Sequence, residues 1–335
     1  MSAAAPRRTR ISTASPENIA AAAECLRAGG LVAMPTETVY GLAALATSDT
    51  AAAAIYAAKG RPSFNPLIAH FANAEDAARE ASLDARALKL ARAFWPGALT
   101  IVAPVSSSCR VSLLARAGLD TLALRVPSHK VAHALIAAAG APLVAPSANR
   151  SGRVSPTTAE HVAQDLDGRI DWILDAGSSP LGLESTIVAC VGGAVRLLRP
   201  GAISREALES VLRESIAEEP EASPDAPIAP GLLASHYAPR ARLRLDATRA
   251  GPGEAALDFG GALASSATAA RLDLSPAGDL EEAAAHLFAH LRALDATDAT
   301  MIAAAPIPKR GLGAGINDRL RRAAAPRPGD TFPST

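Results

Sequence analysis

Short β-type runs alternate with amphipathic helical segments along most of this chain, and this alternation constrains the fold more than any other feature. Ser15 is a typical helix N-cap, Pro16 favours the first helical position, and Gly29 predicts the end of this first helix. Such alternation is typical of an α/β domain, here with a mixed sheet. The predicted strands are 31–34, 67–71, 99–105, 121–126, 142–147, 171–177 and a hairpin of 185–191 with 194–199, and the further predicted helices are 49–58, 84–94, 129–139, 157–166 and 204–216.

A proline-rich, acidic segment interrupts the alternation. Residues 217–230 contain four prolines and four acidic residues with no apolar periodicity, which indicates an extended linker. Beyond it, a helix over 280–295 predicts a second, smaller α/β domain together with strands at 242–246, 255–260, 270–275 and 300–307. The expected division of the chain is a flexible tail over 1–14, a first domain over 15–216, a linker over 217–240 and a second domain over 241–325.

Charge and composition exclude several classes of function. Lysine and arginine number 33 and so do aspartate and glutamate, so the chain lacks the basic excess of proteins that hold long stretches of nucleic acid. Aromatic residues make up only 3% of the chain, which argues against a base-stacking surface. The mean hydropathy of +0.15 is that of a globular protein. No apolar stretch approaches the roughly 20 residues that a membrane-spanning helix needs.

The three cysteines bear on the compartment. Cys25, Cys109 and Cys190 are too far apart for a CxxC metal site or a disulfide framework, which favours the reducing cytoplasm. We expect all three to be small buried hydrophobic residues. No apolar segment follows the arginines near the N-terminus, so we expect no secretory signal and no membrane partner.

Polar residues collect where predicted strands and helices end. Hydroxyl, arginine, lysine and asparagine groups collect in the segments 35–45, 59–70, 145–157, 183–188 and 196–204. Such loops are where α/β folds bind ligands, and this set would suit a nucleotide phosphate with a small polar substrate. For Lys59 and Arg61 alone, the simpler interpretation is that two cations complement a helix C-terminus.

Several catalytic motifs are missing from the chain. The sequence has no GxxxxGK[ST], GxGxxG, GxSxG or HExxH pattern, and its seven histidines do not fall at metal-ligand spacing. A covalent nucleophile and a metal site built from protein side chains are therefore both disfavoured.

Seven ordered motifs carry a resemblance to a known family. PTETVYGL, KGRPSFNPLIAHF, FWPGALTIV, LALRVP, PLVAPSANRSGRVSPT, GLESTIV and RLLRPGAIS follow one another between about residues 15 and 205. Together they resemble the YrdC/Sua5 family of threonylcarbamoyl-AMP synthases. The segments 229–243 and 311–324 resemble the linker and C-terminal domain of its longer, Sua5-type members, although Leu232 stands where many of them have methionine.

The resemblance implies a fold and a reaction. It implies a YrdC-like mixed α/β catalytic domain over 15–216 and a smaller Rossmann-like Sua5 domain over 241–325. Members of this family are nucleotidyltransferases that join L-threonine, bicarbonate or CO2, and ATP into threonylcarbamoyl-AMP and release pyrophosphate, for the N6-threonylcarbamoyl modification of adenosine 37 in tRNA. The implied cofactor is Mg2+ held by the ATP phosphates. The implied downstream partner is the tRNA threonylcarbamoyltransferase machinery, with tRNA met only indirectly.

The resemblance also implies site residues. The positions that match threonine contacts are Thr38, His70, Arg125, Ala145 and Ser185, and Arg125 would grip the α-carboxylate bidentately. The positions that match ATP contacts are Lys59, Arg61, Asn65, Thr121, Ser147, Ser155, Arg199 and Tyr237. Of these we expect Lys59 and Arg61 to be catalytic, by neutralising charge on the departing pyrophosphate, and Tyr237 to reach the nucleotide from a linker that folds across the site. That His70 assists deprotonation of the amine is a further hypothesis.

Two alternatives remain open. One is a module that binds double-stranded RNA, an activity linked to the YrdC fold, although the balanced charge and few aromatics argue against it. The other is a related ATP-using carbamoyl transferase, which would require a carbamoyl-phosphate domain or zinc-type cysteine motifs that this sequence lacks.

Overall fold

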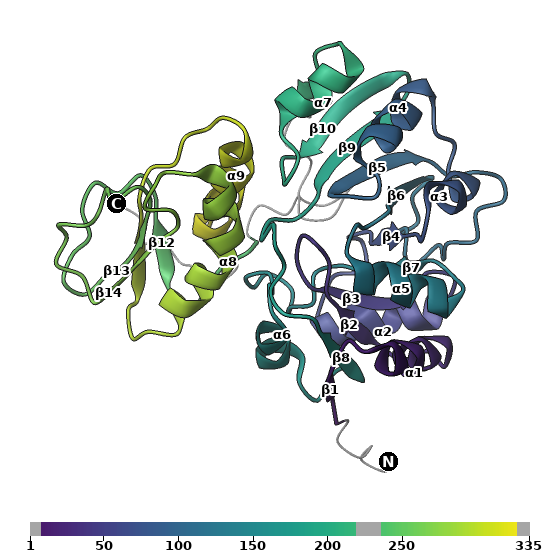
Figure 1. The fold of residues 1–335 in the computed structure, drawn as a ribbon, viewed down its shortest axis with the longest axis horizontal. Helices are drawn as coiled ribbons and strands as arrows, with labels where there is room; N and C mark the ends of the chain where they lie inside the picture. The colour runs from purple at the N-terminus through teal and green to yellow at the C-terminus, as the bar shows by residue number, and fades with distance from the viewer. Residues whose placement is uncertain (1–7, 219–235, 327–335) are drawn as a thin grey trace.

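The computed structural model describes residues 8–218 and 236–326, which form two α/β domains placed side by side (Figure 1). The larger domain is built on an 11-stranded mixed sheet with strand order β1-β8-β2-β3-β7-β4-β6-β5-β9-β10-β11. The smaller domain has a parallel sheet with strand order β12-β15-β13-β14. These two sheets confirm the predicted α/β class with a mixed first sheet and a Rossmann-like second domain.

The bounds of the elements are as follows. The larger domain contains β1 (Arg10–Thr13), α1 (Pro16–Arg27), β2 (Val32–Met34), β3 (Gly41–Leu45), α2 (Asp49–Lys59), β4 (Ile68–His70), α3 (Ala74–Glu80), α4 (Ala85–Phe94), β5 (Leu99–Pro104), β6 (Thr121–Arg125), α5 (Lys130–Ala139), β7 (Leu143–Val144), α6 (Ala159–Leu166), β8 (Trp172–Asp175), β9 (Thr186–Val191), β10 (Ala194–Arg199), α7 (Arg205–Leu212) and β11 (Ala217–Glu218). The smaller contains β12 (Arg242–Arg244), β13 (Ala255–Asp258), β14 (Ala270–Asp273), α8 (Leu280–Asp295), β15 (Met301–Ala304) and α9 (Leu312–Ala324).

Local sequence signals account for many of these bounds. The Ser15 side chain accepts a hydrogen bond from the Asn18 amide and starts α1, as predicted. Gly60 ends α2 in the left-handed conformation (φ 60°), which glycine adopts without steric cost. The helix over 280–295 has the predicted bounds.

The N-terminal tail is shorter than the sequence suggested. Residues 10–13 form β1, which pairs in parallel with β8, so the prediction of a flexible tail is wrong for these residues. The Arg10 guanidinium lies 4.0 Å from the centre of the Trp172 ring, and Trp172 Nε1 donates to Ser12 Oγ at 2.9 Å. The partner strand is about 160 residues away in sequence, so no local pattern reveals the pairing. The rest of the predicted tail, residues 1–7, lies outside the described residues.

Three further elements differ from the sequence interpretation. β3 falls in a segment read as a polar loop, and α3 and α9 were not assigned. The predicted linker begins with a two-residue strand, β11, that pairs with β10, and its residues 219–235 lie outside the described part of the chain.

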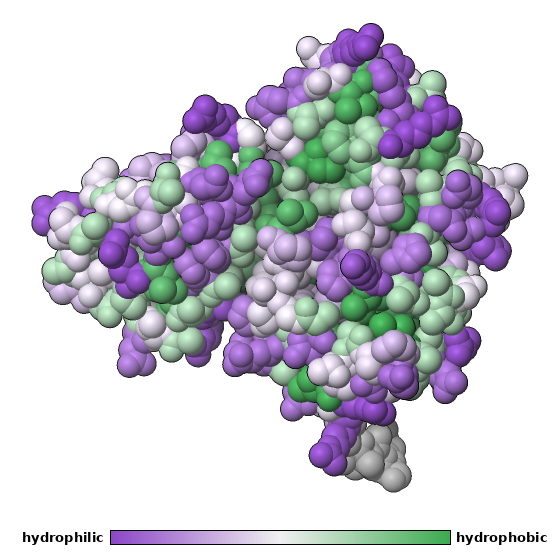
Figure 2. All heavy atoms as spheres, viewed as in Figure 1, coloured by the Kyte–Doolittle hydropathy of each residue, from purple (hydrophilic) through white to green (hydrophobic). Residues whose placement is uncertain are grey.

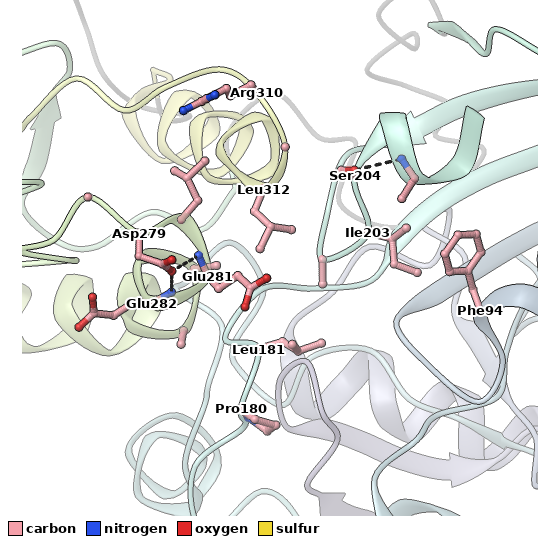
Figure 3. Close-up of a pocket in the computed structure, with 17 residues that line it drawn as sticks. Phe94, Pro180, Leu181, Ile203, Ser204, Asp279, Glu281, Glu282, Arg310 and Leu312 are labelled. Atoms are coloured by element: carbon pink, nitrogen blue, oxygen red, sulfur yellow. Dashed lines mark hydrogen bonds between the residues drawn. The ribbon is translucent and has the colours of Figure 1, made fainter. Parts of the chain in front are cut away.

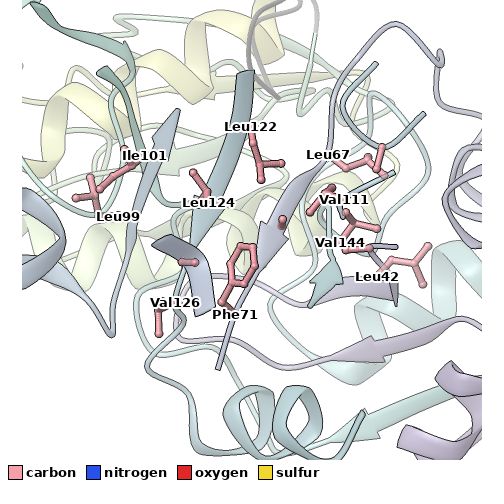
Figure 4. Packing of buried hydrophobic residues seen from close by; sticks show 14 of the residues in the cluster. Leu42, Leu67, Phe71, Leu99, Ile101, Val111, Leu122, Leu124, Val126 and Val144 are labelled. Carbon is pink, nitrogen blue, oxygen red and sulfur yellow. The ribbon is translucent and has the colours of Figure 1, made fainter. Parts of the chain in front are cut away.

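The core of the large domain is made mainly of alanine, leucine, valine and isoleucine. Figure 4 shows side chains of β3, β5, β6 and β7 packed together with Leu67 and Phe71, which flank β4. Many small side chains let helices and sheet approach closely, which compensates for the scarcity of aromatic residues.

The cysteines and the surface complete the description. All three cysteines are free; Cys190 is buried, but Cys25 and Cys109 are only half-buried, so the expectation of three buried cysteines is wrong for two of them. On the visible face, hydrophobic residues form separate patches among hydrophilic ones (Figure 2). Among the described residues, no helix is long and apolar enough to cross a membrane.

Candidate active site

A buried pair of cationic and neutral side chains lies at the ends of β4 and β6. His70 and Arg125 are directly opposed residues of these two parallel strands, and both are buried. Arg125 Nη2 donates to Glu37 Oε1 at 2.6 Å, and Arg125 Nε donates to the carbonyl of Gly97 at 3.2 Å. Among the described residues, Arg125 Nη1 has no hydrogen-bond partner. The protein thus holds the guanidinium through Nε and Nη2, and Nη1 is available to a ligand.

The Glu37 carboxylate neutralises this arginine. Burial raises the pKa of Glu37, but the nearby Arg125 charge and hydrogen bond outweigh that effect and hold the pKa below its usual range. Nη2 donates one of its two hydrogens to Glu37, so a bidentate contact of Arg125 with a substrate carboxylate would use Nη1 and the second hydrogen of Nη2.

His70 is a neutral hydrogen-bond acceptor. Burial, with the adjacent Arg125 charge, lowers the pKa of His70 to about 3. The ring contacts the Ile68 carbonyl through Nδ1 at 3.0 Å, so Nδ1 carries the proton and Nε2 keeps its lone pair.

The other residues expected at the threonine site are buried as well. Thr38 is fully buried, and its hydroxyl lies 2.8 Å from that of Thr36. The Ala145 amide donates to the same Ile68 carbonyl that His70 contacts. Ser185 Oγ lies 2.8 Å from Thr100 Oγ1 in the interior.

Lys59 is a buried ammonium beneath the segment 145–151. Nζ donates to the carbonyls of Ser147 at 2.6 Å and Asn149 at 2.5 Å. Burial and the neighbouring Arg61 charge lower the pKa of Lys59 well below its usual value. The side chain therefore does more than complement a helix C-terminus, because it determines the position of two carbonyls of a polar loop.

Arg61 and Asn65 form a compact unit after α2. Arg61 Nη2 donates to Asn65 Oδ1 at 2.5 Å and to the Pro66 carbonyl at 3.0 Å. Asn65 is fully buried, and its Nδ2 has no hydrogen-bond partner in the described part of the chain. Burial lowers the pKa of Arg61 to about 10, which leaves the group charged at neutral pH.

Arg199 joins the two predicted sets of residues. It donates from Nη2 to the Ser185 carbonyl at 2.8 Å and to Ser185 Oγ at 3.3 Å. Its charge also acts on Arg61, which places the two guanidinium groups near each other. The expected threonine and ATP positions therefore meet at Ser185 and Arg199.

Tyr237 lies on the side of the smaller domain. Its ring stacks on Phe288 of α8 at 5.7 Å between centroids, and Arg319 Cζ of α9 lies 5.3 Å from the ring centre. The charges of Arg61 and Arg199 both interact with the Tyr237 hydroxyl. Neighbouring His236 is buried near Lys59, Arg61 and Arg199, and its Nδ1 lacks a partner among the described residues.

Two predicted ATP residues are placed differently. Ser147 contributes its carbonyl to Lys59, so its backbone takes part at least as much as its hydroxyl. Thr121 is the first residue of β6, whereas Arg125 is the last, and no hydrogen bond among the described residues joins the Thr121 side chain to the other site residues. Because Ile68 pairs with Ala123 in parallel, Thr121 lies toward Pro66, whose carbonyl accepts a hydrogen bond from Arg61.

Neither a metal cage nor a preformed cavity coincides with these residues. Within residues 8–218 and 236–326, no three His, Cys, Asp or Glu side chains lie close enough to hold a metal ion. A cavity of about 910 Å³ lies between the domains, and Figure 3 shows Leu181, Ile203, Asp279 and Leu312 around it. None of the predicted site residues lines it, so we base the site on the buried polar groups and not on this cavity.

Sequence reasoning missed three charged residues of the site. Glu37 pairs with Arg125, Glu184 accepts from Ser155 Oγ at 2.5 Å, and Arg319 donates from Nε to Glu184 at 2.8 Å. Glu37 and Glu184 lie in motifs that were singled out, so a carboxylate beside expected ligand residues was the available signal. The signal for Arg319 was of another kind, because this arginine falls on the apolar stripe of α9 in the smaller domain.

Comparison with known proteins shows the family of this chain. A family profile described as "Telomere recombination", of the Sua5, YciO and YrdC proteins, matches residues 24–201. Another, described as "Threonylcarbamoyl-AMP synthase, C-terminal domain", matches residues 203–325. The threonylcarbamoyl-AMP synthase of Bacillus subtilis is 40% identical over 95% of both chains.

Solved structures extend this similarity to the fold. Pyrococcus abyssi Sua5 complexed with L-threonine superimposes with a TM-score of 0.85 at 37% identity, over 95% of this chain and 97% of that one. A variant of that protein with a histidine and the next residue, a tyrosine, changed to alanine gives a TM-score of 0.86 at 36% identity, over 94% and 96% of the chains. The chain therefore belongs to the Sua5/YrdC family, as a Sua5-type threonylcarbamoyl-AMP synthase with both of the family's domains.

Proposed function

We propose that this protein makes threonylcarbamoyl-AMP from L-threonine, bicarbonate or CO2, and ATP, with release of pyrophosphate, at the site formed by the residues around Arg125 and Arg199. The observation that carries this proposal is the burial of three cations, Lys59, Arg61 and Arg199, in the same domain as the buried pair Arg125 and His70. Buried cations need anionic partners, and a triphosphate beside an amino-acid carboxylate supplies both.

The threonine end would use Arg125 and His70. Arg125 Nη1 would donate to the α-carboxylate, and the neutral His70 Nε2 would accept a hydrogen bond from the α-amine. A threonine amine must lose protons to form a carbamate with CO2. An acceptor that stays neutral through the physiological range supports this step, although its low pKa makes it a weak base.

The nucleotide end would neutralise and position charge. The carbamate oxygen is already an anion when it attacks the α-phosphorus, so no serine or cysteine nucleophile is needed. Lys59 and Arg61 would stabilise the departing pyrophosphate. The unpartnered Nδ2 of Asn65 is a buried donor that a phosphate oxygen would satisfy.

Mg2+ enters this proposal with ATP as the substrate complex. The site around Lys59 and Arg61 is cationic, so its side chains fit the phosphate oxygens and not the metal ion. The ion would supply charge neutralisation on the triphosphate.

The product's fate is also part of the proposal. A mixed carboxylic-phosphoric anhydride is a reactive acyl donor. We therefore expect a separate threonylcarbamoyltransferase machinery to transfer the threonylcarbamoyl group to tRNA adenosine 37, without direct binding of tRNA by this protein. A cytoplasmic location is supported by the three free cysteines.

The test is incubation of the full chain with ATP, Mg2+ and bicarbonate, with and without L-threonine. We expect pyrophosphate release that depends on threonine, and a product with the mass of threonylcarbamoyl-AMP. Release at the same rate without threonine would contradict the proposal.

A further inference from the structure

A fully buried arginine of the smaller domain reaches into the larger one. Arg319 of α9 donates from Nε to Glu184 Oε2 at 2.8 Å and from Nη1 to the Pro200 carbonyl at 2.7 Å. Nη1 also donates to Asp318 at 2.7 Å. Both acceptors in the larger domain lie in or beside the loops that carry the site, so α9 is connected directly to it.

Glu184 contacts both Arg319 and Ser155. Its second oxygen, Oε1, accepts from Ser155 Oγ at 2.5 Å, so each carboxylate oxygen has one strong partner. An ionised carboxylate only accepts hydrogen bonds, so the Ser155 hydroxyl proton points toward Glu184. The lone pairs of Ser155 Oγ are what remain for a ligand.

Ser155 is held from a second direction by α8. Arg292 Nη2 donates to the Val154 carbonyl at 2.5 Å and to Asp165 at 2.7 Å, and Arg292 Nε donates to the Ser155 carbonyl at 3.4 Å. Two arginines of the smaller domain therefore fix the backbone and the hydroxyl direction of one serine in the larger domain.

The contact between the domains leaves little room for this geometry to change. A Cβ on Gly182 would lie 2.5 Å from the carbonyl oxygens of Ala284 and Ala285 of α8. One on Gly315 of α9 would lie 2.8 Å from Leu183 Cδ2. Both close contacts are next to Glu184 or on the helix of Arg319, so backbone packing holds the ion pair in place.

We propose that the Glu184–Arg319 pair positions Ser155 as a hydrogen-bond acceptor for the nucleoside part of ATP. This inference rests on the proposed function and on the expectation, from the family motifs, that Ser155 contacts ATP. Phosphate oxygens at neutral pH are acceptors and cannot satisfy such a serine, whereas the ribose hydroxyls and the adenine amino group are donors. Glu184 and Arg319 are thus positioning residues that make Ser155 selective for a donor on the sugar or base.

The experiment measures nucleotide binding by calorimetry, with ATP, 2′-deoxy-ATP, 3′-deoxy-ATP and inosine triphosphate as probes. The parent protein should bind one analogue at least about tenfold more weakly than ATP, because losing its donor leaves a buried acceptor unpaired. The affected analogue identifies the ribose hydroxyl or the amino group as the partner. Ser155→Ala should bind ATP and that analogue equally.

Variants of the ion pair then test positioning. Glu184→Gln frees the serine proton from its fixed direction and should reduce the discrimination to below about threefold. The double change of Glu184→Gln with Arg319→Met removes both buried charges together and should do the same, while Arg319→Lys should keep part of the discrimination. The matched control is Arg321→Met, on the exposed side of α9 with 68% of its side chain accessible, and it should leave the discrimination unchanged.

Equal affinity of the parent for all four nucleotides would overturn the inference. So would undiminished discrimination in Ser155→Ala, or in a double variant whose melting shows that it is folded. These results are independent of turnover: threonine-independent pyrophosphate release with intact nucleotide discrimination would contradict the proposed function alone, whereas absence of ATP binding would contradict both.

Discussion

Lowering the pH should destabilise the larger domain through His70, and replacement of this side chain should remove that part of the acid sensitivity. Folding lowers the pKa of His70 from 6.5 to about 3, because the ring is buried and lies beside Arg125. Between these two values the unfolded chain binds a proton that the folded chain does not. Stability that is fully present above pH 6.5 is therefore lost progressively as the pH falls from 6.5 toward 3.

The size of the effect follows from the two pKa values. Each pH unit below 6.5 removes about 1.4 kcal/mol of unfolding free energy while the folded histidine stays neutral. At pH 5.0 the His70 contribution alone amounts to about 2 kcal/mol relative to pH 7.5. His70→Gln replaces the ring by an amide that does not titrate, so this variant should lose about 2 kcal/mol less than the parent over the same interval.

Urea unfolding followed by tryptophan fluorescence measures this difference. Trp95 and Trp172 are the only tryptophans of the chain, and both lie in the larger domain, so the signal reports that domain. His133→Gln removes an exposed histidine of α5 and serves as the control for loss of any histidine. If His70→Gln and the parent lose the same unfolding free energy between pH 7.5 and 5.0, the reasoning about a neutral His70 is refuted.

Three further predictions concern the site and the contact between domains. Arg125→Lys should raise the KM for threonine about tenfold or more and that for ATP much less, because an ammonium cannot replace the planar fork; equal changes in steady-state KM would contradict this. Lys59→Met should lower kcat/KM for ATP at least about tenfold. It should also lower the melting temperature, because two buried carbonyls lose their hydrogen-bond donor. An unchanged melting temperature would show that these two hydrogen bonds do not contribute to stability. Gly182→Ala should destabilise the protein by about 1 to 3 kcal/mol in thermal unfolding, because Gly182 has a φ of 60° and an added Cβ would overlap two carbonyls of α8. The control, Gly192→Ala, changes a glycine of similar φ with open space around it and should lower the stability less.

Much of the fold could be predicted because its signals are local. The Ser15 cap, the glycine after α2 and the apolar period of α8 each lie within a few residues of the boundary they specify. β1 could not be predicted in this way, because its stability comes from pairing with a strand about 160 residues away. Its own sequence, RIST, has too little apolar character to distinguish it from a frayed terminus.

The site was predicted as a set of positions and not as a network. Ordered motifs indicated which residues would gather, and the structure does bring Lys59, Arg61, Arg125 and Arg199 into buried positions. The sequence did not show that Arg125 is already paired with Glu37, because a carboxylate in a polar run has no period that assigns it a partner.

The three arginines of α9 show what decides which charges are buried. Arg319 is fully buried, whereas Arg321, two residues later, has 68% of its side chain exposed. The helical period distinguishes Arg319 from Arg321, because Arg319 lies on the same buried face of α9 as Ile316, Leu320 and Ala323. A cation on an apolar stripe is costly unless a carboxylate meets it, so its position in the sequence already indicates an interface with a buried acid. Identifying that acid as Glu184 requires the packing of the two domains, because Glu184 lies 135 residues away in a loop of the other domain.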